Sequence, residues 1–288
     1  ESALISLASR SGSTDLYNVW ERLEAELRCD GPHRGTGPLF SYLRYNRSMS
    51  KNKIVAKLNP MFFSGIAHRG LWNDQLTENG LRAFQNAIDH HLSFEYDIHL
   101  CKDGQLLVCH DDNLKRTTGK EGIIEELTME EIKKNYRLLD GEEVPSFAEV
   151  LALNHEQVPM VCELKVHEGN YKALARAAMK IYRQEIHDKK NLWVISFDPR
   201  ALLPIHGYVR GLLVCKEHLW TLKLRGLFES LDMEDVLVGE PRVVAYRKRH
   251  PVNTWTIEKP EQIVATKPYV DTMTFQRLSP DEVTKALH

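Results

Sequence analysis

The sequence predicts a (β/α)8 barrel, with a β-hairpin after the second strand and a helical extension at the N-terminus. From about residue 63, short apolar segments alternate with longer amphipathic ones, the order typical of parallel β–α units. Eight apolar segments in this length fit one closed barrel of about 200–250 residues, with an appendage, better than an open sheet. The candidate strands are Gly65–Arg69, Phe94–Leu100, Met160–Lys165, Leu192–Phe197, Gly211–Cys215, Arg242–Tyr246, Asn253–Ile257 and Val270–Phe275.

The first 60 residues differ from the rest of the chain. Asp15–Arg28 predicts an amphipathic helix, because its apolar residues recur at helical spacing, and Gly31-Pro32 breaks that pattern. No pattern in this region indicates chemistry. We expect residues 1–60 to be a helical extension or a linker, and residues 61–288 to form the barrel domain.

Amphipathic segments between the candidate strands predict the outer helices of the barrel. Four of them are clear: Gly80–His90, Thr128–Asn135, Ser146–Leu153 and Tyr171–Glu185. A barrel alone does not define a function, but barrel enzymes carry their active sites at the C-terminal ends of the strands. Polar residues at those ends are therefore the candidate functional residues.

Composition excludes several classes of partner. The formal charge is -2, from 38 basic and 40 acidic residues, so no overall field favours nucleic acid. No apolar run approaches the ~18 residues that span a bilayer, although peripheral membrane contact stays open. The five cysteines include no CxxC pair, which favours free thiols in a reducing compartment such as the cytoplasm. The sequence does not indicate an oligomeric state.

The second candidate strand carries an acidic face. Strand alternation puts Glu95, Asp97 and His99 on one side, and apolar residues on the other. If the apolar side packs against helices, the two carboxylates point into the barrel and need compensating charge, which a hard cation supplies most simply. The alternative is an edge strand with a solvated acidic face.

A hairpin follows this strand. Lys102-Asp103-Gly104 is a turn signature, and Leu106–Asp111 continues as a second strand that folds back. With the turn centred between Asp103 and Gly104, His110 lies opposite Asp97, to within two residues. The hairpin therefore brings an imidazole beside the carboxylates without a distant contact.

Two further strand ends carry charged residues. Glu163 and Lys165 share a face at the end of the third candidate strand, where a structural salt bridge is the alternative interpretation. His68 and Arg69 end the first strand, which alone is weak evidence. Together with Glu95 and Asp97, Glu163 completes a set of oxygen ligands that suits Mg²⁺ or Ca²⁺, while no zinc-finger spacing occurs.

Taken together, these motifs resemble the glycerophosphodiester phosphodiesterase family, over roughly Ile66 to Phe275. That family folds as a (β/α)8 barrel. Each motif is short, but their order and spacing are specific. They are His68-Arg69-Gly70, Glu78-Asn79, Glu95-x-Asp97, Lys102-Asp103-Gly104, His110-Asp111, Leu114-x-Arg116-Thr117-Thr118-Gly119, Val144-Pro145-Ser146-Phe147, Glu163-Leu164-Lys165, Ser196-Phe197 and Trp255-Thr256.

The resemblance implies a role for each matching residue. It implies hydrolysis of a small glycerophosphodiester with one divalent cation, Mg²⁺ or Ca²⁺. Two departures occur: the family's Pro-Glu-Asn-Thr is Thr77-Glu78-Asn79-Gly80 here, and its final Thr-Asp is Thr274-Phe275. The implied roles are metal binding for Glu95, Asp97 and Glu163, acid–base catalysis for His68 and His110, phosphate binding for Arg69 and Lys165, contact with the metal shell or a histidine for Glu78, and contact with glycerol for Trp255.

Several alternatives stay open. We expect the glycerol 2-hydroxyl to attack phosphorus and form a cyclic phosphate, with His68 favoured as base and His110 as acid; direct attack by water or by a histidine is the alternative. A lysophospholipase D-like enzyme would need an apolar groove, and a catalytically silent barrel would act as a binding module. The candidates for the groove are Trp72, Phe197, Trp220 and Phe228.

Overall fold

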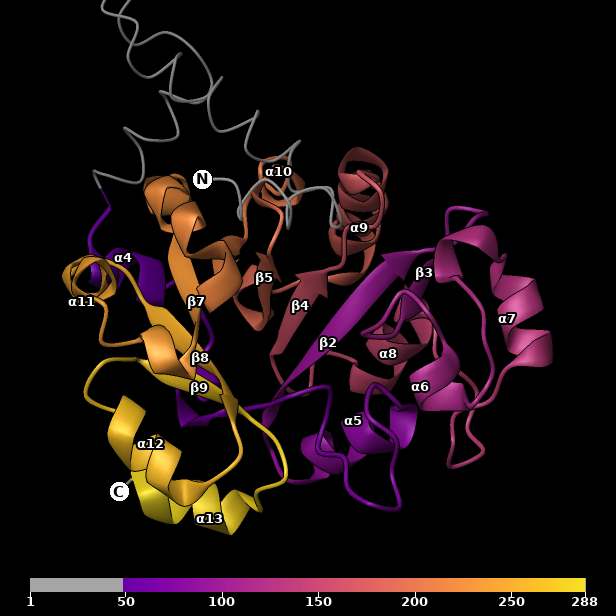
Figure 1. Cartoon of the computed structure of the whole chain (residues 1–288), viewed down its shortest axis with the longest axis horizontal. Helices are drawn as coiled ribbons and strands as arrows, with labels where there is room; N and C mark the ends of the chain where they lie inside the picture. The colour runs from indigo at the N-terminus through magenta and orange to yellow at the C-terminus, as the bar shows by residue number, and fades with distance from the viewer. Residues whose placement is uncertain (1–48, 288) are drawn as a thin grey trace, which may run out of the picture. The chain divides into compact units, whose positions relative to one another are not determined.

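The computed structural model describes residues 49–287, and its strands close into a parallel barrel (Figure 1). The strands follow the order β1-β9-β8-β7-β6-β5-β4-β2, and β1 also pairs with β2, which closes the ring. This confirms the predicted barrel, while the predicted helix Asp15–Arg28 and Cys29 lie outside the described residues. The barrel strands are β1 (Ile66–Ala67), β2 (Ser93–Leu100), β4 (Met160–Leu164), β5 (Leu192–Ser196), β6 (Val209–Val214), β7 (Ser230–Glu234), β8 (Val252–Ile257) and β9 (Thr272–Phe275).

Helices cover the outside of the barrel (Figure 1). The four predicted helices form within two residues of the expected ends. Two of them begin with a capping box, in which Thr128 pairs with Glu131 and Ser146 pairs with Glu149. The α-helices are α4 (Lys51–Val55), α5 (Leu81–Asp89), α6 (Lys115–Thr118), α7 (Met129–Asn135), α8 (Phe147–Asn154), α9 (Tyr171–Glu185), α10 (Pro199–Leu202), α11 (Pro241–Arg247), α12 (Pro260–Thr266) and α13 (Pro280–Leu287).

The predicted hairpin is present, with a register that differs by one residue from the expected one. Strand β3 (Leu106–Val108) runs antiparallel to β2 and pairs His99 with Leu107. The turn is therefore centred on Asp103 rather than between Asp103 and Gly104. As a result Cys109, not His110, lies opposite Asp97, and its N–H donates to the Asp97 carbonyl at 3.1 Å.

One predicted strand is wrong. Arg242–Tyr246 lies in helix α11, which starts with Pro241 at its first position and is capped by Glu240. The Glu240 carboxylate accepts hydrogen bonds from the N–H groups of Arg242 and Val243, so two of the free donors at the helix start are satisfied. The sixth parallel strand of the barrel is instead β7, at residues 230–234.

An apolar cluster closes the N-terminal end of the barrel. The 3₁₀ helix η1 (Pro60–Ser64) runs directly into β1 and places Phe62 against Trp193, with ring centroids 5.7 Å apart in an edge-to-face arrangement. Thr272 at the start of β9 donates its hydroxyl to the Phe62 carbonyl. With this end filled by side chains, polar groups collect at the opposite end, where the strands finish. The cluster contains Met49, Ile54, Leu58, Phe62, Ile66, Val161, Trp193, Ile195, Val209 and Leu213.

The described cysteines are free thiols, of which Cys101, Cys109 and Cys162 are buried and Cys215 is partly exposed. Burial raises the pKa of the Cys109 thiol to about 12, so this neighbour of His110 stays protonated at neutral pH. Within residues 49–287, none of the helices has the length and apolar character needed to cross a membrane.

Candidate active site

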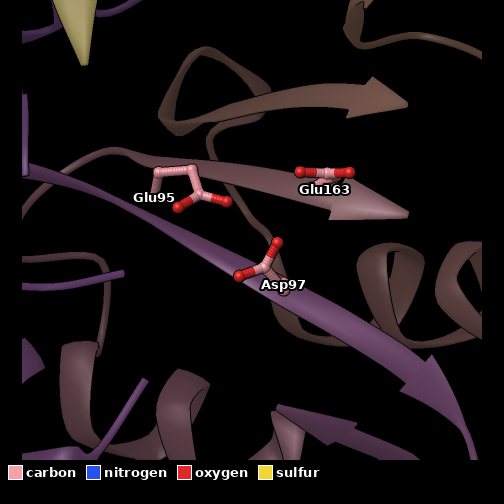
Figure 2. A group of neighbouring side chains, drawn as sticks. All are labelled: Glu95, Asp97 and Glu163. Atoms are coloured by element: carbon pink, nitrogen blue, oxygen red, sulfur yellow. The ribbon is translucent and has the colours of Figure 1, made fainter. Parts of the chain in front are cut away.

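Three carboxylates converge inside the barrel near the strand ends (Figure 2). Glu95 and Asp97 lie on β2, and Glu163 lies on β4 directly opposite Asp97 in the parallel register. One oxygen from each carboxylate lies within 4.8 Å of the others. All three side chains are buried, and Asp97 has no exposed surface. The alternation along β2 and the parallel pairing with β4 are sufficient to produce this cluster.

The cluster carries an excess of buried negative charge. Burial raises the pKa of Glu95 well above its usual range, and repulsion from Asp97 adds to this effect. Burial also raises the pKa of Glu163 to about 7, although Lys165 opposes the shift. Lys165 Nζ lies 2.8 Å from Glu163 Oε1 and 3.1 Å from Asp97 Oδ1. Burial would raise the pKa of Asp97 too, but Lys165 and its other cationic neighbours hold it low.

These residues fit a divalent cation. Three carboxylates face two permanent cations, Lys165 and Arg69, and the buried Asp97 Oδ1 is ion-paired with Lys165 Nζ at 3.1 Å without the geometry of a hydrogen bond. Three carboxylate oxygens within 4.8 Å of one another form the kind of oxygen-ligand set that Mg²⁺ and Ca²⁺ prefer. The sequence prediction that these three residues cluster is therefore matched by their geometry.

A tight turn after β1 places two more candidate residues at the cluster. Arg69 has a φ of 58°, and its N–H donates to Glu95 Oε2 at 3.0 Å. Gly70 also has a positive φ, and a Cβ there would lie 2.9 Å from the Ala83 carbonyl carbon, so only glycine fits. The turn leaves His68 Nε2 3.9 Å from Glu95 Oε2.

The orientation of His68 is set by a glutamine that the sequence analysis did not identify. Gln276 Nε2 donates to the Glu258 carboxylate, so the Gln276 Oε1 atom faces His68 and lies 2.6 Å from Nδ1. An amide oxygen only accepts, so Nδ1 carries the proton and Nε2 is left with a free lone pair. Burial, reinforced by Arg69, lowers the pKa of His68 to about 3, and the imidazole is neutral at physiological pH.

His110 follows the hairpin and has a different partner. Its Nδ1 donates to Asp111 Oδ1 at 2.6 Å, and its carbonyl oxygen lies 3.2 Å from His99 Nε2. Burial lowers the pKa of His110, while Asp97 and Asp111 act in the opposite direction. The two histidines therefore differ: a neutral amide supports His68, and a carboxylate supports His110.

Glu78 contacts arginines rather than a histidine. Its Oε1 atom accepts from Arg69 Nη1 at 2.7 Å, and both of its oxygens accept from the Arg116 guanidinium at 2.8 and 2.9 Å. Glu78 is not among the grouped carboxylates that could hold a metal. From the sequence we expected Glu78 to contact the metal shell or a histidine; in the structure it holds the Arg69 side chain.

A small pocket of about 80 Å³ opens beside the cluster. Its lining mixes charged and polar residues with apolar ones, among them Trp255, whose ring lies edge-to-face with that of Phe197 with centroids 5.6 Å apart. The buried Trp255 Nε1 has no hydrogen-bond partner among the described residues. The lining residues are His68, Arg69, Glu95, His110, Glu163, Ile195, Phe197, Leu213, Asp232, Trp255, Thr256 and Thr274.

The sequence analysis missed Asp232 because it placed the sixth strand in α11. Asp232 lies on β7, faces the pocket and accepts two hydrogen bonds of 2.9 Å from Asn253 Nδ2. Its burial raises the pKa to about 7. The signal was present as alternation in Ser230-Leu231-Asp232-Met233-Glu234, where an acidic residue stands between two apolar ones.

The chain is similar to several known proteins over the region that carries this site. The model of the glycerophosphoryl diester phosphodiesterase family matches residues 68–210. A glycerophosphodiester phosphodiesterase of Caldanaerobacter subterraneus is 39% identical over 99 residues, which are 31% of this chain and 39% of that protein. Human glycerophosphodiester phosphodiesterase 1 is 31% identical over 175 residues, 57% of this chain and 51% of that protein. The chain thus matches about half, or less, of these relatives' length.

Solved structures extend the likeness to the whole barrel. A glycerophosphodiester phosphodiesterase from Parabacteroides distasonis is 26% identical, with a TM-score of 0.64, and the match covers 77% of this chain and 95% of that one. An Oleispira antarctica phosphodiesterase, solved in complex with the product sn-glycerol-3-phosphate, has a TM-score of 0.71 at 23% identity, covering 81% and 98%. At 23% identity, the similarity to the Oleispira antarctica protein is evidence for the fold alone.

Proposed function

Because the chain belongs to the glycerophosphoryl diester phosphodiesterase family, we propose that it hydrolyses glycerophosphodiesters to sn-glycerol 3-phosphate and an alcohol. The observation that carries this proposal is the pocket at the strand ends. It joins two histidines with unlike partners to three buried carboxylates and to Arg69. The relatives that are glycerophosphodiester phosphodiesterases by name support the same activity. We propose no nucleic-acid partner, since nothing in the charge balance favours one.

We propose that Glu95, Asp97 and Glu163 hold one divalent cation, Mg²⁺ or Ca²⁺. A cation bound there would neutralise charge on a phosphodiester, which otherwise repels nucleophiles. Arg69 lines the pocket and is held by Glu78, so its guanidinium is oriented to bind a phosphate oxygen. Lys165 is buried between Asp97 and Glu163 and would add a second positive charge close to the same oxygen atoms.

The unlike partners of the two histidines support distinct roles. His68 is held as the tautomer whose Nε2 lone pair is free, and that atom would take the proton from the substrate's own 2-hydroxyl. Asp111 stabilises a protonated His110, which suits proton donation to the leaving alcohol. The 2-hydroxyl oxygen would attack phosphorus, the bond to the leaving alcohol would break, and a cyclic phosphate would form. Water then opens the ring while the histidines exchange roles.

Trp255 and its neighbours define the side of the pocket where the organic part of the substrate would lie. Trp255 lines the pocket, where its ring would contact the glycerol group, and Asp232 and Thr274 add polar groups to the same lining. The small volume favours a compact glycerol group over a bulky one.

The apolar residues of the pocket lining support a second candidate function, a lysophospholipase D-like activity. Ile195, Phe197 and Leu213 line the pocket beside Trp255 and could contact an acyl chain of a lysophospholipid. Of the four aromatic residues considered for a groove, only Phe197 lines this pocket. Phe228 is fully buried, and Trp72 donates its Nε1–H to the His68 carbonyl. The geometry therefore favours the compact substrate.

The decisive experiment is an assay of the purified chain with glycerophosphocholine, glycerophosphoethanolamine and lysophosphatidylcholine, with Mg²⁺ or Ca²⁺. We expect glycerol 3-phosphate from the first two, and a transient cyclic phosphate by phosphorus NMR. Turnover of lysophosphatidylcholine alone would support the lysophospholipase D-like function. No turnover of any substrate, together with no bound metal, would indicate a silent barrel. Cosedimentation of the chain with lipid vesicles would test peripheral membrane contact separately.

A further inference from the structure

Arg116 has no role in the proposed chemistry, although it lies in the motif Leu114-x-Arg116-Thr117-Thr118-Gly119. Its side chain is not part of the pocket lining. We propose that Arg116 is a positioning residue that holds His110 and Arg69 in a fixed relation to each other across the pocket. This inference rests on the proposed function, because it concerns the residues assigned to proton transfer and phosphate binding.

The guanidinium of Arg116 donates hydrogen bonds to two carboxylates, those of Asp111 and Glu78. Its Nε donates to Asp111 Oδ2 at 2.7 Å and its Nη2 donates to Asp111 Oδ1 at 3.2 Å. On the other side, Nη1 and Nη2 donate to the two oxygens of Glu78 at 2.9 and 2.8 Å. Two such forks use the planar geometry of arginine, which a lysine cannot reproduce.

Each of these two carboxylates in turn accepts a hydrogen bond from one residue that lines the pocket. Asp111 Oδ1 accepts from His110 Nδ1 at 2.6 Å, and Glu78 Oε1 accepts from Arg69 Nη1 at 2.7 Å. The chain of contacts therefore runs from His110 through Asp111, Arg116 and Glu78 to Arg69. His110 comes from the hairpin, and Arg69 comes from the turn after β1, so this bridge joins two separate elements.

The position of Arg116 is itself anchored by buried neighbours. Helix α6 is only one turn long, but Leu114 before it is fully buried and Thr117 within it is nearly so. The turn ends at Gly119, which has a φ of +74° and closes the helix with a left-handed residue. A short, anchored turn therefore presents the guanidinium to both carboxylates.

The network contributes orientation more than global stability. The Arg116 side chain is 47% exposed, and ion pairs so exposed to water contribute little to folding. Hydrogen bonds from Arg116 nevertheless help to hold the pKa of Glu78 low and the pKa of Asp111 at about 2, against the effect of burial on both. Both carboxylates therefore stay ionised, and the forks persist, over the working pH range.

The chain offers a matched control. Arg82 also bridges two carboxylates, with Nη2 3.1 Å from Asp140 Oδ2 and Nε 3.4 Å from Glu142 Oε2. Its side chain is 49% exposed, close to the value for Arg116. Neither Asp140 nor Glu142 lines the pocket. Loss of Arg82 therefore reproduces the loss of a surface bridge without disturbing His110 or Arg69.

The test compares R116A, R116K and R82A with the wild-type chain in glycerophosphocholine turnover. We expect R116A to lower kcat by about 10- to 100-fold, because small displacements of reacting groups are costly, and R116K to recover only a small part. R82A should stay within about two-fold of wild type, and methylguanidine should partly restore R116A but not R116K. The metal concentration for half-maximal activation should be unchanged in each variant, because none of the metal-binding carboxylates is touched.

An NMR measurement separates this inference from the proposed function. The imidazole resonances of His110 should shift in R116A and stay in place in R82A, whether or not the chain turns over substrate. R116A turnover within two-fold of wild type, or an equal loss in R82A, would overturn the positioning role. So would an unchanged His110 spectrum. An inactive wild type with the expected shift would instead overturn the proposed function and leave the positioning role standing.

Discussion

The Nδ1 atom of His68 lies 2.6 Å from Oε1 of Gln276, and the two residues are 208 positions apart in the sequence. Gln276 is itself fixed by Glu258 and by its own N–H, which donates to the Ile257 carbonyl at 2.9 Å. Because the amide oxygen accepts, His68 is held as the tautomer whose Nε2 lone pair is free. This relationship gives His68 and His110 different partners and different proposed roles.

Gln276→Leu should therefore lower kcat by about 10- to 100-fold with little effect on KM, since the substituted side chain cannot orient His68. Steady-state kinetics on glycerophosphocholine would measure both constants. Gln85→Leu is the matched control, because the Gln85 amide donates to Asp89 at 2.7 Å and Gln85 lies outside the pocket. Equal kcat values for the two variants would contradict the role given to Gln276.

His110→Ala should lower kcat by about two orders of magnitude or more, the usual contribution of a general acid or base. Single-turnover measurements would show whether the loss lies in the chemical step. His90→Ala serves as control, because His90 is exposed, lies outside the pocket lining and has its Nδ1 2.8 Å from the Asn86 carbonyl oxygen. Turnover of His110→Ala at the wild-type rate would remove His110 from the mechanism.

Glu163→Gln should weaken metal activation, because it removes one of three carboxylates from the cluster. Titration of activity with Mg²⁺ or Ca²⁺ would show a higher half-saturating concentration, and chelation with EDTA should abolish wild-type activity. Glu130→Gln, at an exposed position in the first turn of α7, should leave the titration unchanged. Full activity after exhaustive chelation would refute the metal model.

Asp232→Asn should change how stability depends on pH. Burial raises the pKa of Asp232 from its ordinary value of 3.8 to about 7, so between these pH values the folded state binds more protons than the unfolded state. Wild-type stability due to this group therefore falls as pH rises from about 4 to about 7. Urea unfolding at several pH values should show the free energy of unfolding of Asp232→Asn rising relative to that of the wild type between about pH 4 and pH 7. A difference in unfolding free energy that does not change with pH would contradict the raised pKa.

Phe62→Ala should destabilise the fold by about 3–5 kcal/mol, the usual cost of removing a large buried aromatic side chain. Phe62 has no exposed surface and contacts Trp193 where the barrel is closed. Denaturant unfolding would measure the loss. Phe63→Ala is the neighbouring control and should cost less, because Phe63 is only partly buried. A smaller loss for Phe62 than for Phe63 would contradict this account of the closed end.

The sequence by itself determined the barrel and the acidic cluster, because both depend on short-range patterns. Alternation along one strand places Glu95 and Asp97 on the same face, and the following turn brings His110 back toward them. A one-residue difference in the hairpin register did not separate these residues. The alternation at Glu163 likewise needed only parallel pairing to bring the third carboxylate into place.

The prediction from sequence was wrong at Arg242–Tyr246, where one local pattern is compatible with both a strand and a helix. Val243-Val244-Ala245-Tyr246 has strand-forming residues, but Pro241 and the cap at Glu240 start a helix there. That error hid β7 and therefore Asp232. Only the tertiary structure decided which distant side chains meet, such as Gln276 with His68, and Glu78 with Arg116. Such contacts depend on where closure of the barrel brings separate loops, and no local periodicity encodes that position.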